Sequence, residues 1–327
     1  MIRNKNSVIQ DTTPFLSWLC GAVTALLMLT SAVADDTRMA TVEGIVATAD
    51  VAYVSDYISF AGSDAQGRVA FALDTNRGRD GDDYQAEHFV VMHDDEEGWI
   101  KIQGDGDYEN KGQALAAIPD SGDFRFSGTP AAGLIVTSPT NGLTLTIDPI
   151  PERTVQGDAG RIFSMGSAPA TLQWHGRTIR GRVIYELLAM ANFNRLSGIT
   201  LGGGFGSFQG LYLRVGENDD FYIHRRQGGE DDELLAFGVT GDATMHPRNL
   251  EFEDTDRTFA PGFYRWPTAW TVHWDAEKGP ATLSVRLHDR NLIVTWILGG
   301  FAMGIVEGTL VYDGRTVPVY GLGELIM

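Results

Sequence analysis

The chain contains nearly the same phrase twice. The segment TLQWHGRTIRGRVIYEL at 171–187 returns as TLVYDGRTVPVYGLGEL at 309–325, which is 138 positions later. The same offset aligns 131–187 with 269–325 without a gap. Spacing shared over some fifty residues is hard to obtain by chance between two unrelated hairpins. The repeat therefore predicts the duplication of one structural unit.

The repeated unit has the pattern of β-sheet. LTLTI at 143–147 and ATLSVRL at 281–287 alternate apolar with polar or small residues, which is typical of half-buried strands. HGRT and DGRT are expected to be hairpin turns in which glycine supplies a positive φ. No long stretch after Ala34 keeps a helical apolar period. We therefore predict an all-β protein of two tandem antiparallel β-barrels, because two copies favour a pair of barrels over a solenoid.

The N-terminus has the layout of a secretory signal peptide. Arg3 and Lys5 precede an apolar run at 15–29, and SAVA ends in a small-residue cleavage site at Ala34. We expect domains at 35–190 and 191–327 after a signal peptide at 1–34, and a periplasmic or secreted protein. An uncleaved membrane anchor is the alternative. After cleavage, no stable membrane insertion is expected.

Charge and cysteine content restrict the partners. The formal net charge is −18, and the single cysteine, Cys20, lies within the expected signal peptide. A strongly acidic surface repels nucleic acid, so nucleic-acid binding is not expected. A mature chain without cysteine has no disulfide, so its stability must come from buried cores.

Motifs for cofactors and metals are absent from the sequence. GGGFG at 202–206 is followed by neither a third spaced glycine nor a helix pattern, and there is no P-loop, nucleophile elbow or zinc-type His pair. The acidic turns RDGDD, HDDEE, ENDD and GEDDE lack EF-hand spacing and are interpreted as solvated turns, with calcium binding as the alternative. No cofactor and no metal are expected.

Three motifs and the two-half layout resemble a known family. DYISFAG at 56–62, RWPTAWTVHW at 265–274 and VEGTLVYDGRTVPVYGLGEL at 306–325 are similar to the AttH/CrtC lipocalin-like family. The resemblance implies two lipocalin-like barrels packed side by side. That family includes carotenoid 1,2-hydratases, relatives of tocopherol cyclase and fungal pericyclases. The resemblance thus also implies a hydrophobic small-molecule partner, isoprenoid-like or lipid-like.

Two carboxyl groups match acidic positions of that family, Asp56 beside Tyr57 and Glu186 beside Tyr185. An acid held among aromatic side chains keeps its proton near neutral pH, which acid catalysis on an alkene requires. Both are candidate catalytic acids, and we expect their site on the face of the first barrel that packs against the second. For Asp56 the alternative is a solvated strand start. For Glu186, whose twin in the repeat is Glu324, it is a structural partnership with Arg182.

Aromatic residues near these acids are candidates for lining a ligand pocket, with ordinary core packing as the alternative. The candidate ligand-binding residues are Tyr57, Phe60, Tyr185, Phe205, Phe208 and Trp270. His224 and the two arginines after it are interpreted as a hairpin end in water, with an anion grip as the alternative.

Three functions remain open from sequence: a carrier for a lipophilic ligand, a cofactor-free hydratase or cyclase, and a structural envelope protein. Fold alone does not choose between them.

Overall fold

The computed structural model describes residues 53–80, 83–103, 106–110, 118, 120, 122–150, 154–158, 161–190, 207–227, 233–240, 243–245, 247–259, 265–296 and 299–326. The expected signal peptide at 1–34 and the predicted boundary after residue 34 lie outside these ranges. The predicted boundary after residue 190 coincides with the end of one described range. No helix occurs in the part of the chain that the structure describes, and none there could span a membrane.

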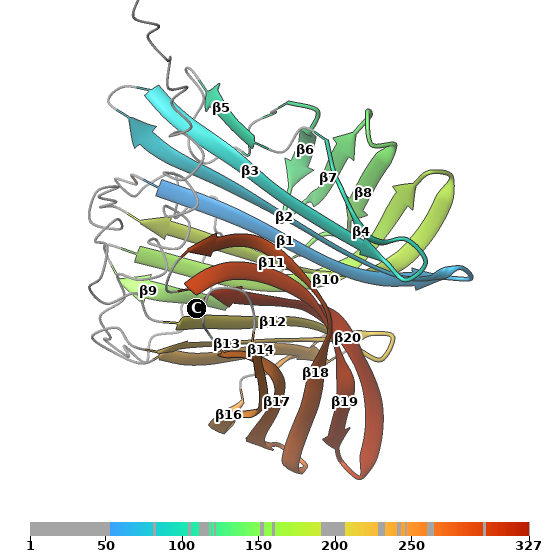
Figure 1. Cartoon of the computed structure of the whole chain (residues 1–327), viewed down its shortest axis with the longest axis vertical. Coiled ribbons are helices and arrows are strands. Elements are labelled where there is room, and N and C mark those ends of the chain that lie inside the picture. The colour runs from blue at the N-terminus through green and yellow to red at the C-terminus, as the bar shows by residue number, and fades with distance from the viewer. Residues whose placement is uncertain are drawn as a thin grey trace, which may run out of the picture.

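The N-terminal sheet curls around its own core, and its described strands are all antiparallel (Figure 1). Its order is β4-β3-β2-β1-β11-β10-β8-β7-β6, with β5 paired to β3 and β9 paired to β10. The strands are β1 (Tyr53–Asp64), β2 (Gly67–Asp80), β3 (Asp83–Asp94), β4 (Gly98–Ile100), β5 (Gly106–Asn110), β6 (Arg125–Thr129), β7 (Gly133–Ser138), β8 (Leu143–Ile147), β9 (Thr154–Asp158), β10 (Arg161–Trp174) and β11 (Arg177–Met190).

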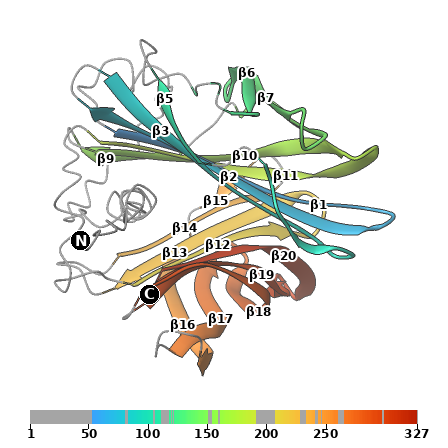
Figure 2. The ribbon, with the colours of Figure 1, turned by 45° about the horizontal axis from the view of Figure 1, so that its top comes forward.

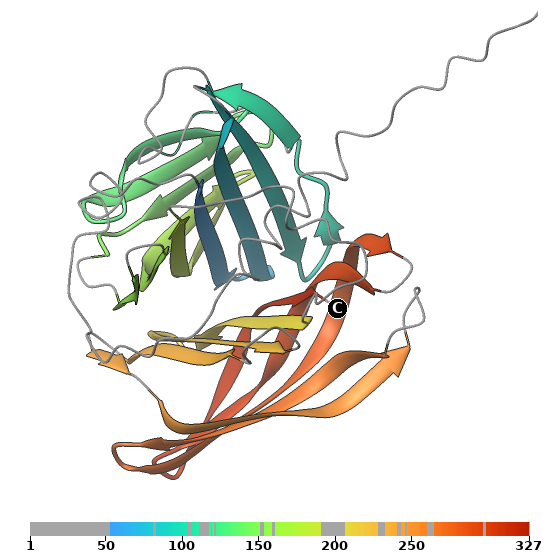
Figure 3. The ribbon, with the colours of Figure 1, turned by 90° about the vertical axis from the view of Figure 1, so that its left-hand side faces the viewer.

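The C-terminal sheet is built in the same way and packs against the first (Figures 2 and 3). Its order is β15-β14-β13-β12-β20-β19-β18-β17-β16. The strands are β12 (Ser207–Val215), β13 (Asp219–Gln227), β14 (Glu233–Thr240), β15 (Ala243–Met245), β16 (Arg248–Phe259), β17 (Arg265–Ala276), β18 (Gly279–Trp296), β19 (Gly299–Tyr312) and β20 (Arg315–Ile326).

The two sheets repeat one topology. In each, the first strands run outward from β1 or β12, and the last strand, β11 or β20, returns to pair with that first strand. Gly176 and Gly314 occupy the equivalent β10–β11 and β19–β20 turns with φ of 81° and 68°, and His175 and Asp313 before them also have positive φ. Consecutive left-handed residues fit a type I′ hairpin turn. The predicted all-β fold of two tandem lipocalin-like units is confirmed.

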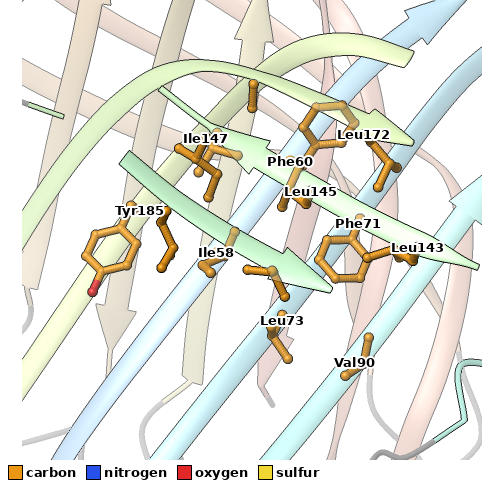
Figure 4. Close-up of a cluster of buried hydrophobic side chains, with 14 of the residues drawn as sticks. Ile58, Phe60, Phe71, Leu73, Val90, Leu143, Leu145, Ile147, Leu172 and Tyr185 are labelled. Atoms are coloured by element: carbon orange, nitrogen blue, oxygen red, sulfur yellow. The ribbon is translucent and has the colours of Figure 1, made fainter. Parts of the chain in front are cut away.

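Three buried clusters follow from strand alternation. One lies on the concave side of the N-terminal sheet, where Figure 4 shows Phe60, Phe71 and Leu145 pointing toward one another. A second lies on the concave side of the C-terminal sheet around Trp266 and Trp270. The third joins the two sheets and contains side chains of both, among them Tyr57, Tyr212 and Phe301. We call this third cluster and its polar neighbours the seam.

Candidate active site at the seam

Alternation along β1 decides which of its side chains meet the second sheet. Val54, Ile58 and Phe60 belong to the core of the N-terminal sheet, whereas Tyr57 and Ala61 belong to the seam. Successive residues of a strand point to opposite faces, so the identity of a seam residue fixes its neighbours across the sheet.

Each half contributes one row of seam residues at equivalent register. In the N-terminal sheet, Tyr57 on β1 lies opposite Asp74 on β2 and Glu186 on β11. In the C-terminal sheet, Gly210 on β12 lies opposite His224 on β13 and Glu324 on β20. The twin glutamates of the sequence repeat therefore both face the seam.

One tyrosine joins the two glutamates. The Tyr212 hydroxyl lies 3.2 Å from Glu186 Oε2 and 3.4 Å from Glu324 Oε2, so it can donate to either. The Tyr212 ring packs with its centroid 4.7 Å from those of Tyr57 and Tyr222. We call Tyr57, Asp74, Glu186, Tyr212, Tyr222 and Glu324 the acid–tyrosine cluster.

Burial favours the protonated form of two carboxyls in this cluster. Desolvation raises the pKa of Glu324 well above its usual range, and the nearby Glu186 and Asp74 raise it further. Desolvation raises the pKa of Asp74 to about 6. Both side chains are partly exposed by their surface area, so proton exchange with solvent remains open. The cluster can therefore hold an exchangeable proton near neutral pH.

The tyrosines of the cluster stay protonated. Desolvation, assisted by the neighbouring carboxylates, raises the pKa values of Tyr57, Tyr212 and Tyr222. The Tyr222 hydroxyl is hydrogen-bonded to Nδ1 of His224 at 2.8 Å. The Tyr57 hydroxyl is buried and has no hydrogen-bond partner in the part of the chain that the structure describes. A buried hydroxyl without a partner is a costly group that a bound ligand or water would satisfy.

Ion pairs fix the two sheets on either side of the cluster. Asp220 on β13 accepts hydrogen bonds from Arg182 on β11 and Ser167 on β10, and these contacts cross the seam. Arg68 on β2 pairs with Glu307 on β19 at 2.8 Å. These contacts hold the rows of the two halves face to face.

The structure places the two predicted acids on opposite faces of one sheet. Asp56 points to the concave side of the N-terminal sheet, where it pairs with Arg77 at 2.5 Å and accepts a hydrogen bond from Tyr185. The expectation that Asp56 faces the seam is wrong, because Tyr57 and not Asp56 shares a face with Glu186. Asp56 is also buried, so its alternative as a solvated strand start is wrong.

Glu186 does face the seam. Arg182, which was its predicted structural partner, forms a buried pair with Asp220. Glu186 itself accepts from Tyr212 of the other half. Glu186 also shares a side-chain hydrogen bond with Tyr222, and its charge helps to raise the pKa of Glu324.

The predicted aromatic residues divide among the three clusters. Tyr57 and Phe208 lie at the seam. Phe60 and Tyr185 lie in the N-terminal core, and Figure 4 shows the Tyr185 oxygen turned away from that cluster. Trp270 lies in the C-terminal core and donates its Nε1 hydrogen to Gln209 at 2.7 Å. Phe205 lies outside the described residues.

Sequence reasoning missed Asp74, Tyr212 and Tyr222, and placed His224 in water although it is buried. Their signal was available. Asp74 shares the strand face of Ala70 and Ala72, and both tyrosines stand at alternate positions of the hairpin 207–227. The repeat relates Glu186 to Glu324, and the other members follow once strand pairing is known. Among the described residues, no group of three His, Cys, Asp or Glu side chains is placed to hold a metal ion.

Comparisons with known proteins agree on the fold. No family model matches the sequence, and no curated protein matches it. The structure is similar to that of a Nitrosomonas europaea protein described as an AttH, with TM-score 0.58 and 12% identity, over 91% of this chain and 99% of that chain. It is also similar to kievitone hydratase from Nectria haematococca, with TM-score 0.53 and 12% identity, over 91% and 95%. The expected two-domain AttH-type fold is thus confirmed.

Proposed function

We propose that the protein is a cofactor-free enzyme that protonates a carbon–carbon double bond of an apolar small molecule at the seam. The reaction is completed by addition of water or by ring closure. The observation that carries this proposal is the acid–tyrosine cluster, in which Tyr212 joins Glu324, a carboxyl with a raised pKa, to its twin Glu186.

The proposed roles balance protons over one turnover. The Glu324 carboxyl gives its proton to one alkene carbon, and a carbocation forms at the neighbouring carbon. A water molecule then forms the new C–O bond and loses its proton to the Glu186 carboxylate. The proton returns to Glu324 through the Tyr212 hydroxyl or through solvent. The sum is alkene plus water to alcohol; in ring closure, a second double bond of the substrate replaces water as the nucleophile, and the proton lost from the ring carbon passes to Glu186.

The surroundings of the carboxyls support this assignment. The rings of Tyr57, Tyr212 and Tyr222 present π faces, which stabilise a nearby cation electrostatically. The Tyr57 hydroxyl, without a partner among described residues, is suited to hold the attacking water. The structurally similar kievitone hydratase is by name a hydratase, which favours water addition as the first reaction to test.

A two-step experiment tests the proposal. Native mass spectrometry of protein purified from its own host identifies any co-purified apolar molecule. That molecule, or the host lipid extract, is then incubated with the protein in H₂¹⁸O. We expect a product that carries ¹⁸O or an isomer of the substrate. Glu324→Gln and Glu186→Gln should each lower turnover by roughly 10²–10⁴-fold.

The matched control is Glu307→Gln. Glu307 is a seam glutamate of β19 whose partner is Arg68, so this variant should keep turnover. A tightly held ligand that is never converted, by wild type or variant, would contradict the enzyme proposal and support a lipophilic-ligand carrier. No ligand and no turnover would leave the structural envelope protein as the better interpretation.

We also propose that the protein acts outside the cytoplasm after cleavage behind Ala34. The arrangement of Arg3, Lys5 and the apolar run 15–29 supports this. N-terminal sequencing of the exported protein should begin at Asp35. A mature protein that begins at Met1 would contradict the proposal.

A further inference from the structure

A second site is suggested by Arg290, which lies on the concave side of the C-terminal sheet. Its guanidinium carbon is 5.7 Å from the ring centroid of Trp266, a fully buried member of the C-terminal core. This position is on the far side of the sheet from the seam. Arg290 is therefore separate from the acid–tyrosine cluster.

A β-bulge turns Arg290 inward. The pairing of β18 with β19 shifts between Leu287 and Asp289, so His288 is an extra residue in the strand. Beyond it, Asp289 faces the seam and lies 3.5 Å from His93, while Leu292 packs on the C-terminal core. Bulges of this kind re-aim side chains and are enriched beside functional sites.

Arg290 has no counter-ion among the described residues. Burial lowers the pKa of its guanidinium, and its Nη1 is buried without a hydrogen-bond partner there. Arg225, on the same concave side, differs because Asp254 accepts its hydrogen bond. A partly buried guanidinium without an anion is unfavourable, so this position is suited to bind one.

Two further donors lie on β17, the strand next to β18. Trp266 Nε1 and Thr268 Oγ1 are both buried and have no hydrogen-bond partner in the described part of the chain. Trp266 belongs to the C-terminal core, and Thr268 lies two residues further along β17, where the pairing with β16 shifts register. Apolar side chains lie beside them, since Leu287 and Leu292 pack against the same core and are partly exposed.

We infer that the concave side of the C-terminal sheet binds a lipophilic acid, whose anionic head group is held by Arg290 with Thr268 and Trp266, and whose apolar body lies against Leu287 and Leu292. The formal net charge of −18 makes a local cation necessary for an anionic ligand. Arginine presents a planar pair of donors that matches the oxygens of a carboxylate or a phosphate, and a carboxylate is the head group that we test against a phosphate.

Calorimetric titration of the protein tests this site with three probes. Dodecanoate and dodecyl phosphate are used below their critical micelle concentrations, and dodecan-1-ol is used below its solubility limit. Wild type should bind dodecanoate about tenfold or more tightly than the alcohol, as expected for charge-assisted hydrogen bonds. Tighter binding of the phosphate than of dodecanoate would overturn the carboxylate assignment. Arg290→Met should reduce the preference for dodecanoate over the alcohol to about one, and should leave the melting temperature unchanged or raised.

Arg286→Met is the matched control. Arg286 lies on the same strand but is exposed and pairs with Asp256 on the outer face, so its loss should leave the preference intact. Thr268→Val, a smaller change, should weaken dodecanoate binding by roughly threefold or more. Equal binding of acid and alcohol by wild type, or an unchanged preference in Arg290→Met, would overturn the inference. Turnover at the seam is a separate readout and does not decide it.

Discussion

The two halves of the seam share a backbone and differ in chemistry. At equivalent register, the N-terminal row carries Asp74, Tyr57 and Glu186, and the C-terminal row carries His224, Gly210 and Glu324. The glutamate alone is the same in both rows. On the next seam-facing row, the N-terminal half has the small Ser59 and Ala72 where the C-terminal half has Tyr212 and Tyr222.

The shared strand order belongs to the scaffold, whereas the differing side chains belong to the candidate site. Duplication supplies two sheets that can face each other, and their strand order has been kept. The acids of both halves meet around a single hydroxyl, that of Tyr212. Asp74 adds a third carboxyl to the cluster, where it accepts hydrogen bonds from Ser55 and Asn76 and raises the pKa of Glu324. The two rows therefore carry different side chains on equivalent backbone positions. The distinct acid and base roles proposed above require such a difference.

The largest expected effect concerns the contact that holds the halves together. Arg182→Met leaves Asp220 buried without its cation, which should cost about 3–5 kcal/mol of unfolding free energy. Denaturant titration measures this loss. Arg68→Met removes a more exposed partner of Glu307 and should cost about 1 kcal/mol or less. Similar losses in both variants would mean that the buried pair does not fix the seam.

The second prediction concerns Asp74, which has no acidic counterpart in the C-terminal row. Its folded pKa of about 6 lies above its ordinary value of 3.8, so the folded protein binds this proton more tightly than the unfolded chain. The protonated Asp74 carboxyl therefore contributes roughly 2–3 kcal/mol to the unfolding free energy below pH about 4. This contribution is lost as the pH rises through about 6. Asp74→Asn should remove this loss.

Asp95→Asn is the control for that pH series. Arg68 pairs with Asp95 and lowers the pKa of that carboxyl, so the ionised Asp95 stabilises the fold. Removing this carboxylate should therefore lower the stability at higher pH, which is the opposite pH dependence to that of Asp74. Melting curves from acid to neutral pH measure both variants. A slope unchanged in Asp74→Asn would contradict the raised pKa assigned to this carboxyl.

The third prediction concerns Gly210, which contributes no side chain to the C-terminal row. A methyl group at Gly210 would meet the rings of Phe208 and Tyr212 at 3.0–3.3 Å. Gly210→Ala should therefore cost about 1–2 kcal/mol through overpacking and disturb the Tyr212 hydroxyl. Gly176→Ala tests backbone strain instead, since its added methyl group would meet nothing within 4 Å but its φ is 81°. Chemical denaturation separates the two, and turnover should fall in Gly210→Ala alone.

The smallest expected effect is the coupling between the twins. The Glu186 charge helps to raise the pKa of Glu324, so Glu186→Gln should lower that pKa. Carboxyl resonances in ¹³C NMR titrations report this shift. An unchanged titration of Glu324 would show that the two carboxyls are not electrostatic neighbours.

The sequence predicted the fold better than the site. The 138-residue offset anticipated that Gly176 and Gly314 occupy equivalent turns, because turn geometry and strand alternation are local properties. It did not reveal which face of β1 meets the seam. That depends on the β1–β11 register, in which Tyr57 and not Asp56 lies opposite Glu186. A slip of one residue would have reversed the answer.

Local pattern also failed at the bulge. Alternation from Leu283 and Val285 onward would place Asp289 on the concave side and Arg290 on the outer side. The extra residue His288 exchanges the faces of Asp289 and Arg290, and the neighbouring sequence contains no signal for this bulge. Burial of His224 was missed for a related reason, since the packing of one half on the other is not a property of either hairpin alone.

The central claim is that the seam holds a protonated carboxyl at neutral pH, ready to act as an acid. Infrared difference spectroscopy between wild type and Glu324→Gln measures this directly, because a protonated carboxyl has its own C=O stretching band. The account predicts that wild type shows this band at neutral pH, that Glu324→Gln lacks it, and that Glu307→Gln retains it. A spectrum in which Glu324 is fully ionised at neutral pH would contradict the account.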